Sequence, residues 1–223
     1  MHIYLPYADP PQANQSATDL TIAELAGPLT VSGYQLVPQP CIQLTDYEDG
    51  FRHWWHQGLP FLVWEHDIVP TYAMIAELAQ CPEPWCAQAY LLTHDARPFA
   101  ALRDLIPVFE ASDTARSWSG YADWQAYIAD IPPLTANAVA WQTVAHRVAT
   151  AEGWRWLRPG EDWADYVGFG LTKFTPDVPL DRTDWRAGSW RDLDSRVSDW
   201  AHARGIRWHI HWPLAAHYHV LEG

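Results

Sequence analysis

Short apolar runs alternate with amphipathic segments along the amino-terminal part of the chain. The runs have the length and composition of strands, and the predicted strands cover residues 2–6, 34–43, 59–64 and 85–92. The predicted helices lie between them at residues 16–26, 47–57 and 70–81, the first beginning at Ser16 or Thr18. This alternation is typical of an α/β sandwich with a largely parallel central sheet.

Proline and glycine mark the expected boundaries of these elements. Gly27 and Pro28 should stop the first helix and Pro82 the third, because proline cannot continue the hydrogen-bond ladder of a helix. Pro38 and Pro40 should confine the second strand to an edge of the sheet, since neither can donate a ladder hydrogen bond.

The rest of the chain is less orderly. Its predicted elements are helices at 98–110, 121–129 and 136–152, a strand at 166–174, a helix at 191–204 and a strand at 206–212. Residues 95–165 would then form a helical insertion or lid. Because a chain of 223 residues can bury a single core, we expect one domain over residues 1–223.

Composition supports a compact protein, with 48% hydrophobic and 18% charged residues. No apolar stretch is long enough to cross a membrane, and the start of the chain lacks the basic and apolar regions of a signal peptide. Three cysteines are an odd number and do not suggest a disulfide framework. We therefore expect a protein of the cytoplasm, without a membrane partner.

The formal net charge is −13, which disfavours broad attraction to nucleic acid and favours divalent cations. The fifteen tryptophans could stack on sugars or bases, but bulky core packing is the simpler interpretation.

Three polar residues, Glu65, His66 and Asp67, directly follow the buried run at 59–64. In open α/β sheets ligands bind at the carboxyl ends of strands. On extended backbone Glu65 and Asp67 would point to the same side and share one cation, with His66 facing away. Mg²⁺ and Mn²⁺ suit such carboxylates, and the alternative is that the acidic residues cap the following helix.

Two segments resemble a known family. FLVWEHDIVPTYAMIAELAQ looks like the central strand, Asp-x-Asp-type motif and following helix of nucleotide-sugar glycosyltransferases with the GT-A fold. WRDLDSRVSDWAHARGIRWHIHWPLAAHYHV resembles the carboxy-terminal part of family 2-like members. VWEHDIVPT, CPEPWCA, GFGLTKF and HIHWPLAAHYH are also similar to small glycosyltransferase-like proteins of actinobacteria and their phages. The resemblance implies a GT-A-like, Rossmann-like three-layer sandwich with a mostly parallel central sheet.

The resemblance also implies roles for individual residues. It makes Glu65 and Asp67 the metal and diphosphate motif, with Mn²⁺ or Mg²⁺ as cofactor, and His219, with His217 nearby, would complete the metal site. Asp194, or else Asp192, would be the general base that deprotonates the acceptor hydroxyl.

The same resemblance implies contacts to the substrates. The residues assigned to donor or acceptor are Trp64, His66, Gly168, Gly170, Lys173 and, from the loosely similar start IYLPYADPP, Tyr7 and Asp9. The chain departs from the family pattern where Glu65 replaces the first Asp of the motif and where Arg191-Asp192 replaces Glu-Asp.

Other candidates are simpler to explain. His209, His211, His217 and His219 invite a zinc interpretation, but their spacing lacks the helical HExxH pattern, and hydrogen-bonded core histidines are the plain alternative. Cys81 and Cys86 do not form a CxxC motif and are expected to be packing residues.

The sequence therefore predicts a metal-dependent glycosyltransferase that uses a nucleotide-sugar donor. The rivals are a metal-dependent phosphate-ester hydrolase using the same carboxylates and a non-catalytic binding protein on the same fold. If the chain comes from a phage, a modified DNA base is one candidate acceptor. It would need a local basic groove from Arg182, Arg186, Arg191 and Arg196, which the overall charge does not support.

Overall fold

The protein is a mixed α/β structure with a mainly parallel central sheet. The computed structural model describes residues 1–8, 15–42, 44–92, 143–144, 146–158, 160–176 and 193–217. The helices predicted at 98–110 and 121–129 lie outside these residues, as do Asp9, Asp192 and His219.

The central sheet has the strand order β2-β1-β3-β11-β5-β12-β4. Its strands are β1 (His2–Ala8), β2 (Gln35–Cys41), β3 (Phe61–Trp64), β4 (Ile68–Val69), β5 (Cys86–Leu92), β11 (Leu171–Phe174) and β12 (Trp208–His217). β1 is parallel to β2 and β3, and β5 is parallel to β12. β11 is antiparallel to both β3 and β5, so β1, β2, β3, β5 and β12 all point the same way.

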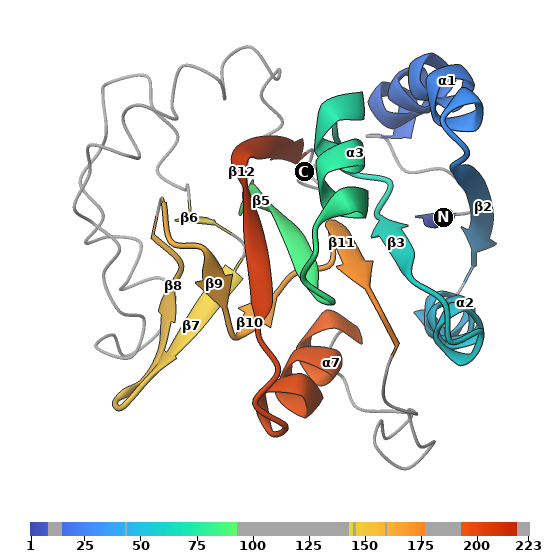
Figure 1. Ribbon diagram of the computed structural model, residues 1–223. Helices are drawn as coiled ribbons and strands as arrows, with labels where there is room; N and C mark the ends of the chain where they lie inside the picture. Colours follow the sequence, from blue (N-terminus) through green and yellow to red (C-terminus); the bar gives the residue numbers. More distant parts are fainter. Residues whose placement is uncertain are drawn as a thin grey trace, which may run out of the picture.

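Helices cover both faces of this sheet (Figure 1). Leu29 of α1 (Gln15–Val31) and Met74, Ile75 and Leu78 of α3 (Tyr72–Gln80) belong to one apolar cluster, together with Leu62 and other side chains of one sheet face. The other face packs against α2 (Leu44–His56) and α7 (Leu193–His202). The sheet is thus the middle of three layers.

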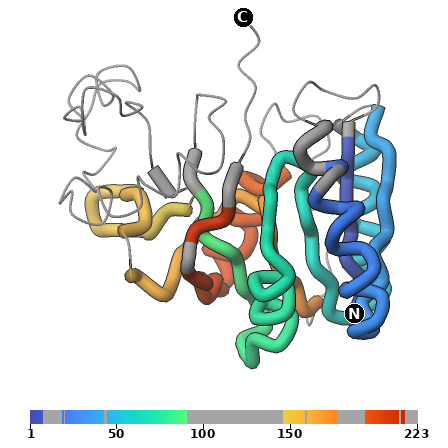
Figure 2. The backbone as a smooth tube through the Cα atoms, turned by 90° about the horizontal axis from the view of Figure 1, so that it is seen from above, coloured from blue at the N-terminus to red at the C-terminus, as the bar shows by residue number. Residues whose placement is uncertain are grey.

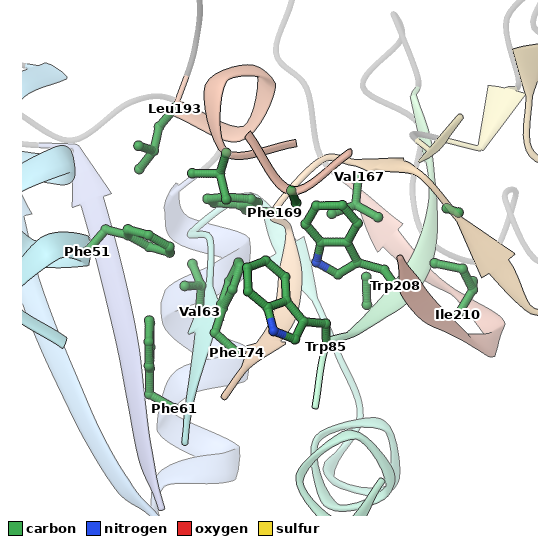
Figure 3. Close-up of a cluster of buried hydrophobic side chains, with 14 of the residues drawn as sticks. Phe51, Phe61, Val63, Trp85, Val167, Phe169, Phe174, Leu193, Trp208 and Ile210 are labelled. Atoms are coloured by element: carbon green, nitrogen blue, oxygen red, sulfur yellow. The ribbon is translucent and has the colours of Figure 1, made fainter. Parts of the chain in front are cut away.

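Aromatic rings fill the core between the sheet and α2 and α7 (Figure 3). Trp85 packs edge to face against Trp55 and Trp208, with ring centroids 5.3 Å apart in both pairs. Phe51 and Phe174 meet in the same way at 5.0 Å. Such pairs favour this geometry because the ring edge is electropositive and the ring face electronegative. These tryptophans are core residues, as the sequence led us to expect.

The first helix is longer than predicted. α1 continues through Gly27 and Pro28 to Val31, so the prediction that these residues stop it is wrong. Leu29 is 1% exposed, and burying it keeps the last turn helical beyond the proline. The helix ends where Gly33 adopts a positive φ of 80° and the N–H of Tyr34 donates to the carbonyl of Leu29.

The region expected to hold a helix at 136–152 contains strands wherever the structure describes it. β6 (Thr143–Val144) pairs with β5, and β7 (His146–Thr150) forms a hairpin with β8 (Gly153–Trp156). β10 (Tyr166–Val167) completes a second sheet of order β10-β7-β8, which lies at the opposite end of the molecule from α1 (Figure 2). β9 (Trp163–Ala164) pairs with β12. The helical insertion is therefore wrong for the described part of 95–165.

The remaining boundaries shift only slightly. β2, which carries Pro38 and Pro40, is an edge strand as predicted. The strand expected at 166–174 is interrupted at residues 168–170, where the chain passes from the small sheet to the central one. Among the described residues, no helix is long and apolar enough to cross a membrane.

Candidate functional site

The acidic triplet lies in a tight turn at the carboxyl end of β3. The N–H of Glu65 donates to the carbonyl of Gly170 at 2.7 Å, and the N–H of Ile68 donates back to the carbonyl of Glu65 at 3.1 Å. The expected extended backbone is therefore wrong, because the hydrogen bond between residues three apart closes a turn. Beyond the turn, β4 pairs with the end of β12, and Ile68 lies opposite His217. This register brings the backbone of His217 next to the triplet.

A tyrosine on α2 holds the Glu65 carboxyl group. The hydroxyl of Tyr47 donates to Oε1 of Glu65 at 2.6 Å, and the hydroxyl of Tyr4 donates to the carbonyl of Tyr47 at 3.2 Å. Tyr4 comes from β1 and Glu65 follows β3, so this chain of contacts joins two parallel strands to the covering helix. It fixes the position of one of the two candidate carboxylates.

Asp194 joins the triplet from a distant part of the chain. It lies in the first turn of α7, where its Oδ1 accepts a hydrogen bond from the N–H of Ser195 at 2.6 Å. Burial, then the charge of Asp67, and further the charge of Asp194 raise the pKa of Glu65 to about 8. The charges of Asp67 and Asp194 therefore both disfavour ionisation of Glu65.

Tyr90 and Gly170 pack against each other next to the acidic triplet. The pKa of the buried Tyr90 is raised by burial and then by the charges of Glu65, Asp194 and Asp67. A Cβ added to Gly170 would lie 2.5 Å from Cε1 of Tyr90, well inside van der Waals contact. Gly170 thus permits the close backbone approach that its sequence context suggested.

A cation, Arg147, packs on the tyrosine that bonds to Ser195. The guanidinium carbon of Arg147, on β7, lies 3.9 Å from the ring centroid of Tyr166, and the hydroxyl of Tyr166 hydrogen-bonds to that of Ser195. Nε of Arg147 is buried and meets no hydrogen-bond partner among the described residues. The pKa of Tyr166 is raised mainly by burial; the charge of Asp194 raises it further, and that of Arg147 lowers it. We call Glu65, Asp67 and Asp194 the acidic site.

Two residues predicted to touch substrate are held by contacts inside the protein. Trp64 is fully buried, and its indole Nε1 donates to the carbonyl of Ile68 at 2.8 Å, so its ring serves the core. The ammonium group of Lys173 donates to the carbonyls of Cys81 and Glu83, at the start of β5 and away from the carboxylates. Both side chains therefore serve the packing of the protein, and their contact with a substrate stays a prediction.

The structure also describes three other residues that were predicted to touch substrate. His66 is half-buried in the turn itself, and Gly168 is buried in the segment before β11. Tyr7 is half-buried at the end of β1, opposite Pro40 of β2.

A second cluster of polar side chains lies at the amino ends of β5 and β12. Cys81, Cys86, His209 and His211 each offer one ligand atom, and these atoms all lie within 4.8 Å of one another. Sγ of Cys81 is 3.5 Å from Nδ1 of His209, and the thiol of Cys86 donates to the carbonyl of Glu83 at 3.2 Å. Among the described residues, this is the one group of three or more such side chains that lies so close together. We call it the Cys/His cluster.

The two clusters suit different metals. Carboxylate oxygens at the acidic site are hard ligands of the kind that Mg²⁺ and Mn²⁺ prefer. Two thiols and two imidazoles are the ligands of Zn²⁺ and related transition metals, and not of Mg²⁺. The sequence interpretation treated the cysteines and His209 and His211 as packing residues, and their convergence could not be read from spacing alone.

Sequence reasoning also missed Tyr47, Tyr90, Tyr166 and Arg147. None belongs to a motif, and each comes to this part of the molecule only through the pairing of strands and helices distant in sequence. The nearest signal was Gly170, whose lack of a side chain is explained by the Tyr90 ring.

Comparison of the chain with protein-family models, with curated proteins and with solved structures found no match.

Proposed function

We propose that the protein is a metal-dependent glycosyltransferase that moves a sugar from a nucleotide-diphosphate donor to an acceptor hydroxyl. The observation that carries the proposal is that the buried Glu65, which follows the carboxyl end of β3, lies near enough to Asp67 and Asp194 for both charges to raise its pKa. The finer fold assignment, a GT-A-like sandwich, belongs to the same proposal and rests on the resemblance of the two segments described above.

Glu65 and Asp67 would hold Mg²⁺ or Mn²⁺, with His217 or His219 supplying a further ligand. Such a cation, when bound, neutralises the charge that develops on the leaving diphosphate. The charges of Asp67 and Asp194 act against ionisation of Glu65, and this supports the assignment because a cation would relieve the repulsion.

The protein's own groups then have separate tasks. Tyr47 keeps Glu65 in place through its hydrogen bond. Asp194, at the start of α7, accepts the proton of the acceptor hydroxyl, with Asp192 as the other candidate for this role.

Donor binding is tested first by thermal unfolding of the purified protein with nucleotide diphosphates and nucleotide-sugars, in Mn²⁺, Mg²⁺ or a chelator. We expect one nucleotide to raise the Tm only when the metal is present, because ligand that binds the folded state stabilises it. Asp67→Asn should abolish the shift. Asp19→Asn, an exposed residue of α1, is the matched control and should keep it.

Transfer itself is tested by release of the nucleoside diphosphate and by product analysis. Asp194→Asn should lower kcat by about 10²- to 10⁴-fold with little change in donor affinity, as expected for loss of a general base. Asp199→Asn, exposed on the same helix, should keep full activity. Nucleotide-independent phosphate release would favour the hydrolase instead. Donor binding without turnover would favour a binding protein, and no binding of any nucleotide would overturn the donor site.

A further inference from the structure

The Cys/His cluster is assembled by three elements that converge at one end of the sheet. Cys81 ends α3, where Pro82 prevents the helix from continuing, and its N–H donates to the carbonyl of Leu78. The short connection through Pro82 and Pro84 returns the chain to Cys86, the first residue of β5. Two prolines restrict this connection, so the two thiols are held near each other.

The two histidines come from β12, more than a hundred residues later. β12 is parallel to β5, with His209 opposite Cys86, so their side chains leave the same face of the sheet. His211 is two residues further along and lies on that face too. The imidazole rings of His209 and His211 are 4.9 Å apart. Figure 1 shows β5 and β12 side by side, next to α3.

The distances agree with a tetrahedral metal site. With Zn–S of about 2.3 Å and Zn–N of about 2.05 Å, neighbouring sulfur and nitrogen ligands are about 3.6 Å apart. Sγ of Cys81 and Nδ1 of His209 are 3.5 Å apart, and all four ligand atoms lie within 4.8 Å of one another. Small side-chain rotations would therefore bring all four atoms into bonding distance of one ion.

The surroundings also favour a metal. Nε2 of His211 is buried and has no hydrogen-bond partner among the described residues, which is costly unless something binds it. Lys173 lies opposite Cys86 in the β11–β5 pair, and the carbonyls of Cys81 and Glu83 hold its ammonium group. Backbone carbonyls thus fix this ammonium group beside the cluster.

We propose that Cys81, Cys86, His209 and His211 form a structural site for one tetrahedral transition-metal ion of the zinc class. On binding, each thiol releases its proton to solvent and the two imidazoles coordinate in the neutral form. The two thiolates balance the charge of the ion, so the site adds no net charge to the buried region. The ion would tie the end of α3 to the starts of β5 and β12.

This site is separate from the acidic site and does not depend on the proposed transferase activity. On β5, Cys86 lies four residues before Tyr90, or about 13 Å along the strand. No position is left open for a substrate when four protein ligands surround the ion, so a structural role fits the ligand count.

The test uses the full chain purified under reducing conditions. We expect one zinc ion per chain by elemental analysis. Replacement by Co²⁺ should give the intense visible bands of tetrahedral cobalt and a sulfur-to-cobalt charge-transfer band. Removing the metal with a chelator should lower the Tm by roughly 5 °C or more, and zinc should restore it. Two protons should be released for each ion bound.

Variants assign the ligands. His211 is half-buried, so His211→Asn should disturb the packing less than replacement of a buried cysteine. The variant should weaken zinc binding by at least about tenfold while the chain stays folded. Cys81→Ser with Cys86→Ser should abolish the charge-transfer band. The controls are Cys41→Ser and His56→Asn, both outside the cluster, and Asp67→Asn at the acidic site; each should keep the metal.

Two results would overturn the proposal. The first is a folded, fully reduced protein that takes up neither zinc nor cobalt. The second is a protein in which Cys81 and Cys86 form a disulfide under the same reducing conditions, which would make the pair a redox element. A wild-type protein that holds zinc but binds no nucleotide donor would count against the proposed function alone.

Discussion

Glu65 shows how burial and charge act together on a single side chain. Its pKa of about 8 follows first from burial and then from Asp67, while Tyr47 opposes the shift by donating a hydrogen bond. In the unfolded chain the group ionises near its ordinary value of 4.5. Between these two pH values the folded state keeps a proton that the unfolded state releases.

The stabilising effect of this proton has a defined direction. It is fully present below about pH 4.5 and is lost as the pH rises through about 8. In the presence of a chelator, the stability of Glu65→Gln relative to the wild type should therefore increase as the pH rises. The expected increase in the free energy of unfolding is on the order of a few kcal/mol. Urea unfolding over a pH series measures it. Glu77→Gln, exposed on α3, should follow the wild type, and a constant difference for Glu65→Gln would contradict the assignment.

Gly170 is constrained by contact and not by backbone conformation. A methyl group there would meet the Tyr90 ring at 2.5 Å, whereas one at Gly27, on the exposed side of α1, would meet nothing within 4 Å. Gly170→Ala should cost about 1–3 kcal/mol by overpacking. Gly27→Ala should be neutral or stabilise by up to about 1 kcal/mol, because alanine suits a helix better. Equal Tm values for the two variants would show that Tyr90 moves aside freely.

At the scale of elements, a buried ion pair couples the two helices on one face of the sheet. Arg196 of α7 donates to the carboxylate of Glu48 of α2, and both side chains are nearly inaccessible, at 8% and 11%. This pair holds α7, and with it Asp194, against the helix that carries Tyr47. It also removes Arg196 from any basic groove for DNA.

Replacing one partner of this ion pair should destabilise the protein more than replacing both. Arg196→Met should cost about 3–5 kcal/mol because Glu48 is left charged and buried, while Arg196→Met with Glu48→Leu should recover much of the loss. Denaturant unfolding of both single variants and the double variant gives the coupling energy. Additive costs would mean that the two groups do not interact in solution.

The elements found from sequence are those whose pattern is local. The apolar runs that became β1, β3 and β5, and the apolar spacing of α3, are set by neighbouring residues. α1 passed through Pro28 because distant core residues bury Leu29, and the hairpin of β7 and β8 is held by β10. These contacts join residues that are far apart in the chain, which a local pattern cannot show.

The same distinction explains what was predicted of the two sites. Glu65 and Asp67 follow a buried strand and could be singled out directly. The sequence shows Cys81 and Cys86 near one another and His209 beside His211, but it does not show the register that sets His209 opposite Cys86. The two pairs come together only because β5 and β12 are paired in this register.

For the whole molecule, the net charge of −13 limits what can bind without specific contacts. Random duplex DNA should bind with a Kd no tighter than about 10⁻⁴ M at physiological salt, because few lysines and arginines are present to displace counterions. Fluorescence anisotropy measures it. Micromolar binding that weakens steeply with salt would instead reveal a concentrated basic surface and revive DNA as an acceptor.

β11 is only four residues long, yet it borders both sites. Gly170, just before the strand, binds the backbone of Glu65, and Lys173 within it binds the carbonyls of Cys81 and Glu83. The amide protons of this strand should therefore act as a common reporter. Their exchange with solvent should slow when a metal occupies the Cys/His cluster and slow again when a donor fills the acidic site, so that one peptide records the loading of both.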